Sequence, residues 1–102
     1  MNPRQMQQMV QKAQRQMEKM QEELANSVVE GSAGGGAVTI TMSGQRDVKS
    51  ITISPDVIDP EDVEMLQDLL MAAINDASTR VQELQQEKMG PLMGGMNMPG
   101  LF

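Results

Sequence analysis

The stretch AVTITMSGQRDVKSITISPDVID, residues 37–59, decides the fold that the sequence predicts. Over residues 38–43, apolar side chains alternate with hydroxyl side chains, a pattern typical of a strand with one buried face. After a turn, β-branched residues return over 48–53 and stop before Pro55, whose nitrogen cannot donate to a strand ladder. We therefore expect two antiparallel strands joined as a hairpin.

A third strand is expected over residues 28–33, because a two-stranded ribbon is only marginally stable in water. The three glycines at 34–36 separate it from the next strand. A phosphate-binding loop would need a helix directly after the glycines, whereas a strand follows here, so we interpret them as a hairpin connection. The result is a three-stranded antiparallel sheet.

A long helix is predicted before the sheet, from Pro3 to about Ala25. Asn2 is suited to cap the helix, proline is favoured at the first helical position, and Gln5 follows three residues after the cap. Apolar residues then recur at steps of three and four, which predicts one narrow apolar stripe: Met6, Val10, Ala13, Met17, Met20 and Leu24.

The opposite side of this first helix carries four cations, Arg4, Lys12, Arg15 and Lys19. Charged residues on an amphipathic helix usually form only a solvated face. A face of cations is also the usual feature of a surface that contacts phosphates. The pattern alone leaves both interpretations open.

A second helix is predicted to begin at Asp59-Pro60, where a capping residue precedes a proline. Its apolar stripe is wider than that of the first helix, so we expect this helix to cover the sheet. Met89-Gly90-Pro91 is expected to end it. The domain then comprises residues 1–89, followed by a flexible tail rich in Met, Gly and Pro over residues 90–102.

Composition sets further limits. With 102 residues the chain is expected to form one domain, and Phe102 is its only aromatic residue, so the core must be built from Val, Ile, Leu and Met. No cysteine is present, and no apolar run approaches the 18 or so residues of a membrane span. We expect a cytoplasmic protein with no membrane partner.

Charge is unevenly distributed. The formal net charge is −6, yet residues 1–49 hold six Lys or Arg against five Asp or Glu, while residues 50–102 hold two against nine. The overall charge argues against nonspecific binding of a polyanion, whereas the basic first half allows it.

Catalytic chemistry is not expected. The chain contains neither His nor Cys, so the common general base and the soft metal ligands are missing. The carboxylates of residues 56–62 are better explained as helix caps than as a cation site. We predict a protein that is not an enzyme, with no cofactor, no metal and no small-molecule substrate.

Three runs of sequence resemble the YbaB/EbfC family of bacterial nucleoid-associated proteins. These are GAVTITMSG at 36–44, VKSITISP at 48–55 and EMLQDLLMAAINDA at 64–77. The resemblance implies an α+β protomer of order α-β-β-β-α, with two long flanking helices, that forms a homodimer through its sheets. It also implies a nucleoid protein that binds double-stranded DNA, alters its conformation and influences gene expression.

The candidate contacts to DNA are the basic residues of the two helices: Arg4, Lys12, Arg15, Lys19, Arg80 and Lys88. The alternative hypothesis is a dimeric scaffold that holds another protein through its Met-rich helix and tail, without binding DNA.

Overall fold

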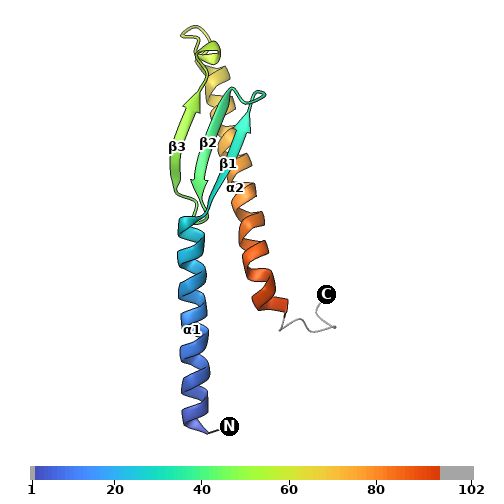
Figure 1. Ribbon diagram of the computed structural model, residues 1–102. Coiled ribbons are helices and arrows are strands. Elements are labelled where there is room, and N and C mark those ends of the chain that lie inside the picture. Colours follow the sequence, from blue (N-terminus) through green and yellow to red (C-terminus); the bar gives the residue numbers. More distant parts are fainter. Residues whose placement is uncertain (1, 95–102) are drawn as a thin grey trace.

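The computed structural model describes residues 2–94, with side chains through Gly90. Its elements follow the predicted order of helix, three strands and helix (Figure 1). The molecule is elongated, with principal extents of 70 × 29 × 16 Å. The elements are α1 (Pro3–Asn26), β1 (Val28–Ala33), β2 (Val38–Ser43), β3 (Val48–Ile53), a short 3₁₀ turn η1 (Pro55–Val57) and α2 (Val63–Gly94).

Helix α1 begins where the capping pattern predicted. The side chain of Asn2 accepts a hydrogen bond of 2.8 Å from the backbone N–H of Gln5, and Pro3 occupies the first helical position. At its other end, the backbone N–H of Ser27 donates to the carbonyl of Leu24. Both ends therefore satisfy backbone groups that the helix itself leaves free.

The sheet confirms the three predicted strands and their antiparallel order β1-β2-β3. Gly34, Gly35 and Gly36 all have positive φ in the β1–β2 connection, so they form the predicted hairpin turn. Between β2 and β3 the register shifts at Thr41/Met42, and Lys49 has no partner across the ladder.

The predicted start of the second helix was wrong by about three residues. Asp59 accepts the backbone N–H of Glu61 in a tight turn, whereas Asp62 accepts that of Met65 and caps α2. Two aspartates three residues apart can each act as a cap, and the second one starts the helix.

The predicted end of this helix was also wrong, because α2 continues through Gly90 and Pro91 to Gly94. Proline has a helical φ, and at this position it lies within the last turn and a half of the helix. Residues 95–102 of the predicted tail lie outside the described residues.

The core forms where α2 crosses β1 and β2 (Figure 1). Ile40 in the central strand is fully buried, and Gly31 in β1 allows close approach, since a Cβ there would collide with the backbone of Ala73 and Ala77. Small residues in both α2 and β1 thus allow the helix to pack closely against the sheet. The buried apolar cluster consists of Val38, Ile40, Met42, Ala73, Ala77 and Val81.

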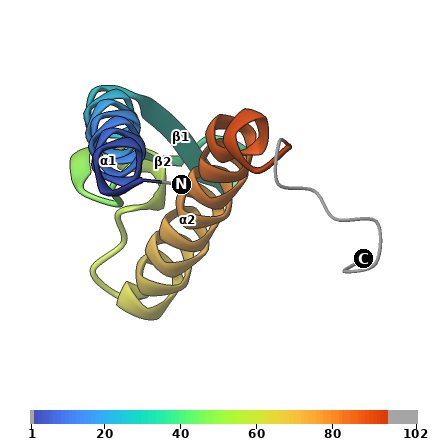
Figure 2. The same ribbon diagram turned by 90° about the horizontal axis from the view of Figure 1, so that it is seen from below.

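Helix α1 contributes little to this core. Only Met20 and Leu24 near its C-terminal end are buried, and residues 2–19 are exposed throughout. Below the sheet, α1 and α2 diverge, and the view from below shows them lying apart (Figures 1 and 2). The molecule is therefore a packed body with a projecting helical rod.

Candidate nucleic-acid interface

The four predicted cations of α1 lie together on the projecting rod. At 3.6 residues per turn, Arg4, Lys12, Arg15 and Lys19 fall within an arc of about 80° and extend over about 22 Å of helix. All four are exposed. No acidic residue precedes Glu18 in the chain. We call this surface the basic face of α1.

These cations form no ion pair within the described residues, although Glu22 and Glu23 follow Lys19 by one helical turn. Among residues 2–94, the only ion pair within 4.0 Å joins Arg80 and Asp76 on α2. The apolar stripe of α1 lies on the other side of the rod, so the basic face is open to solvent along its length. Such a surface can approach a charged ligand without first losing an internal contact.

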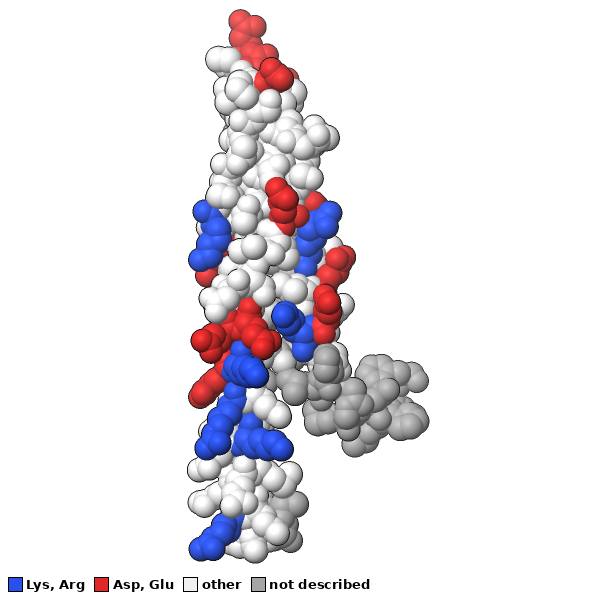
Figure 3. All heavy atoms as spheres, viewed as in Figure 1, with Lys and Arg blue, Asp and Glu red and all other residues white. Residues whose placement is uncertain are grey.

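Acidic and basic side chains are unevenly distributed, with one end of the molecule free of cations and both signs present elsewhere, as Figure 3 shows. Between Lys49 and Arg80 the chain has no Lys or Arg, and acidic side chains gather at the end formed by η1 and the start of α2. Helix α1 holds its four cations against Glu18, Glu22 and Glu23, so most of the net charge of −6 is carried by the rest of the chain, while these three carboxylates lie at the C-terminal end of the basic face. Because salt screens charges beyond about 8–10 Å, the distant acidic end weakens the basic face only slightly.

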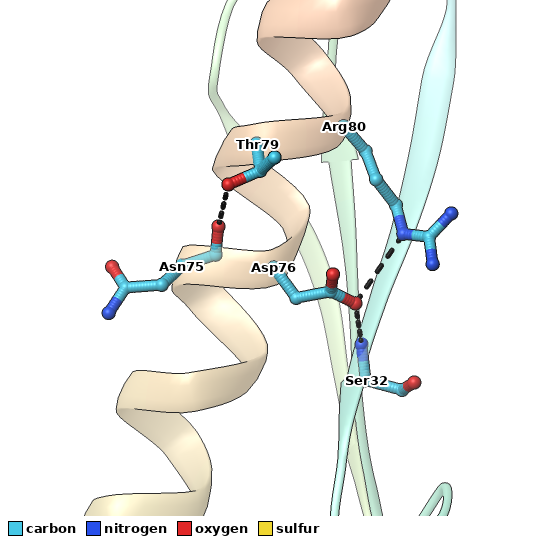
Figure 4. Close-up of polar contacts among 5 residues, drawn as sticks. All are labelled: Ser32, Asn75, Asp76, Thr79 and Arg80. Atoms are coloured by element: carbon cyan, nitrogen blue, oxygen red, sulfur yellow. Dashed lines mark hydrogen bonds and ion pairs between the residues drawn. The ribbon is translucent and has the colours of Figure 1, made fainter.

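Arg80 occupies a different environment from the α1 cations (Figure 4). Its Nε donates to Oδ2 of Asp76 at 3.4 Å, and the same oxygen accepts the backbone N–H of Ser32 in β1 at 2.9 Å. The hydrogen bond from Ser32 and the nearby guanidinium lower the pKa of Asp76 below its usual value of 3.8. This contact attaches α2 to the free edge of β1.

The groove beside Arg80 is not suited to phosphate. It has a volume of about 610 Å³ and is lined by three carboxylates, those of Glu30, Glu83 and Glu87, against one guanidinium. Lys88 is half-buried near the end of α2. The six predicted residues thus divide into four that share the basic face of α1 and two that lie apart from it on α2.

The comparisons with known proteins agree with this fold. A family model described as the YbaB/EbfC DNA-binding family matches residues 1–96. The chain belongs to this family. A protein of Chloroflexus aurantiacus named nucleoid-associated protein is 64% identical over 100% of both chains. One of Roseiflexus castenholzii with the same name is 56% identical over 98% of this chain and 99% of its own.

A solved structure shows the same fold at low sequence identity. The crystal structure of the uncharacterized Helicobacter pylori protein HP0035 aligns with a TM-score of 0.79 and 22% identity, covering 91% of this chain and 98% of that one. The arrangement of helices and strands in this YbaB/EbfC protein is therefore shared by a distant structure.

Two further cations of this family member lie in the β2–β3 hairpin and were not among the predicted contacts. Arg46 lies in the β2–β3 turn with φ of 67°, and Lys49 lies at the register shift in β3. The turn contacts α1, since Nε2 of Gln45 donates to the carbonyl of Gln21 at 3.3 Å. No sequence pattern could reveal this proximity, because it depends on how the turn packs against the helix.

Apolar surface is left uncovered at the β3 edge of the sheet. Val48 and Ile51 of β3 pair with buried residues of β2, so they face the same side as α2, yet each is about half exposed. Asp76 contacts β1, and the exposed side chains of Met71 and Ile74 lie about 140–160° around α2 from Asp76, on the flank away from β1. We call Val48, Ile51, Met71 and Ile74 the β3 apolar surface.

Other kinds of site find no support in the described residues. No helix between residues 2 and 94 is long and apolar enough to cross a bilayer. The same residues contain no group of three or more acidic side chains placed to hold a metal ion.

Proposed function

We propose that this protein binds double-stranded DNA in the nucleoid as a homodimer, through the basic faces of two α1 helices. The observation that carries the proposal is the row of four exposed, unpaired cations on a rod that the protein core does not cover. Membership in a DNA-binding family and relatives named nucleoid-associated proteins support it.

Phosphates would be the principal contacts. Lys and Arg side chains on an exposed helix face can neutralise backbone phosphates, which provides affinity without sequence readout. Two copies of four cations would release about eight counterions, so the logarithm of the binding constant should fall with the logarithm of salt concentration at a slope near −7.

The β3 apolar surface supports the homodimer. Its four residues are large apolar side chains that each remain exposed, and β3 also presents a free strand edge. A second copy would cover this patch and would place two rods on one particle. Homodimers with twofold symmetry are the commonest arrangement of this kind.

The decisive experiment compares two variants of equal net charge by fluorescence anisotropy with labelled duplex DNA. The first replaces Lys12, Arg15 and Lys19 by Gln. The second replaces Gln67, Gln82 and Gln86, all exposed on α2, by Glu. Loss of about six contacts per dimer should weaken binding more than 100-fold and reduce the salt slope in the first variant only.

Equal weakening in both variants would show that total charge, and not the basic face, governs binding. No binding by the wild-type protein at micromolar concentration in low salt would remove the DNA proposal. The scaffold hypothesis would then be favoured, because Met6, Met9 and Met17 on α1 are also exposed.

The dimer is tested separately by analytical ultracentrifugation. Ile51→Glu places a charge in the β3 apolar surface and should yield a monomer. Thr52→Glu is the matched control. Thr52 follows Ile51 in the chain, but its side chain lies on the other face of the sheet and is already exposed. Dissociation by the control alone would assign the interface to the hydroxyl-bearing face.

A further inference from the structure

A groove lies between α1 and α2 where the two helices pass the end of the sheet. It has a volume of about 430 Å³. Its walls come from the C-terminal half of α1, the β2–β3 turn and the last part of α2 (Figure 1). The lining residues include three methionines, Met17, Met20 and Met89, together with Leu24.

Two of the three glutamines that line this groove donate to backbone carbonyls of its wall. Nε2 of Gln85 donates to the carbonyl of Gly44 at 3.1 Å, and Nε2 of Gln45 donates to that of Gln21 at 3.3 Å. What remains for a ligand is uncharged surface, in which the side chains of Met17 and Met89 lie beside amide groups, and no charged residue lines the groove. Its chemistry therefore suits an uncharged apolar segment, and thioethers favour contact with an aromatic ring.

Residues 95–102, with the sequence GMNMPGLF, have this chemistry. They contain no charged side chain, and they include the only aromatic residue of the chain, Phe102. Pro99-Gly100 is a dipeptide that favours a turn before Leu101 and Phe102. The segment begins after Gly94, which is five residues beyond Met89 in the wall of the groove.

The length of this segment allows it to return to the groove. Met89 and Gly94 are separated by about 7.5 Å along the axis of α2. Eight residues can extend over about 26 Å, more than three times that distance. We propose that residues 95–102 of this chain dock in the groove, with Phe102 against the half-exposed side chain of Met17.

This docking is compatible with the basic face of α1. Met17 and Arg15 point about 160° apart around the helix, so a segment that covers Met17 leaves the cations open. The inference stands without the DNA-binding proposal, because it depends only on the groove and on the sequence that follows α2.

A single substitution makes the proposal measurable. The chain has no Trp or Tyr, so Phe102→Trp introduces the only indole. Its emission should be shifted to shorter wavelength and its quenching by acrylamide reduced, because the ring is removed from water. Emission typical of exposed indole in the otherwise wild-type chain would overturn the proposal.

Groove variants in the Phe102→Trp background identify the binding surface. Met17→Gln should abolish the shift, and since Met17 is about half exposed the helix should still form, as circular dichroism can verify. Met65→Gln is the matched control on a part of α2 away from the groove, and it should keep the shift. Loss of the shift in both variants, or in neither, would contradict docking at this groove.

A mixing experiment distinguishes the same chain from a second copy. Protein carrying both Phe102→Trp and Met17→Gln is mixed with excess protein that has an intact groove and Phe102→Ala. The emission should stay that of exposed indole, since the segment belongs to the groove of its own chain. A restored shift would show that the segment docks on a neighbouring molecule and would overturn the proposal.

Discussion

Helix α1, with 24 residues, and helix α2, with 32, have opposite relations to the sheet. α2 is held along much of its length by buried alanines, a glycine in the facing strand and a carboxylate on the strand edge. α1 is held only near one end, and its first 17 residues have no cover. The difference shows that α2 stabilises the fold, whereas α1 provides exposed surface.

The sharpest test of this comparison truncates one side chain from each region. Ile40 is fully buried beneath α2, whereas Met9 on α1 is 58% exposed. Ile40→Ala should lower the free energy of unfolding by about 3 kcal/mol, because it removes buried methyl groups and leaves a cavity. Met9→Ala should change it by less than about 0.5 kcal/mol.

Urea unfolding followed by circular dichroism measures both values under the same conditions. Similar losses in the two variants would mean that α1 is packed as firmly as the body, and the comparison would fail.

A second test concerns the close approach of α2 to β1. Gly31→Ala would force its Cβ against the backbone of Ala73 and Ala77, so it should cost about 2 kcal/mol. Gly90→Ala is the matched control, since a Cβ there meets nothing within 4 Å, and it should cost nothing and stabilise α2 by up to about 1 kcal/mol. Thermal unfolding would rank the stabilities of the two variants. A Gly31→Ala protein as stable as the wild type would disprove the tight contact.

The smallest expected effect concerns pH. The pKa of Asp76 is lowered in the folded protein, chiefly by the hydrogen bond from Ser32. A carboxyl group with a lowered folded pKa stabilises the protein above its unfolded pKa, and this contribution is lost as pH falls through the folded pKa. Stability should therefore decline below about pH 4, near the usual value of 3.8.

Asp76→Asn tests this contribution, because the amide oxygen can still accept from Ser32 while the group no longer titrates. The difference in stability between wild type and variant should shrink as pH is lowered from 6 toward 2. A constant difference over that range would remove the link between this carboxylate and the edge of β1. Asp68→Asn, an exposed change on the same helix, is the control.

Prediction from the sequence succeeded where a local pattern decides the structure. The strand bounds follow from alternation interrupted by glycines, and the start of α1 follows from Asn2 and Pro3. The ends of α2 were predicted wrongly, since Asp59 and Asp62 offer competing caps and Pro91 is tolerated near the end of the helix.

For the candidate site, the sequence by itself determined that Arg4, Lys12, Arg15 and Lys19 share one side of a helix, because the helical period places them there. Only the tertiary structure decided that this side stays uncovered and that Arg80 pairs beside the edge of β1. Ser32 and Asp76 are 44 residues apart in the chain, and packing alone brings them together. Local periodicity specifies a face, whereas burial of apolar area selects which faces meet.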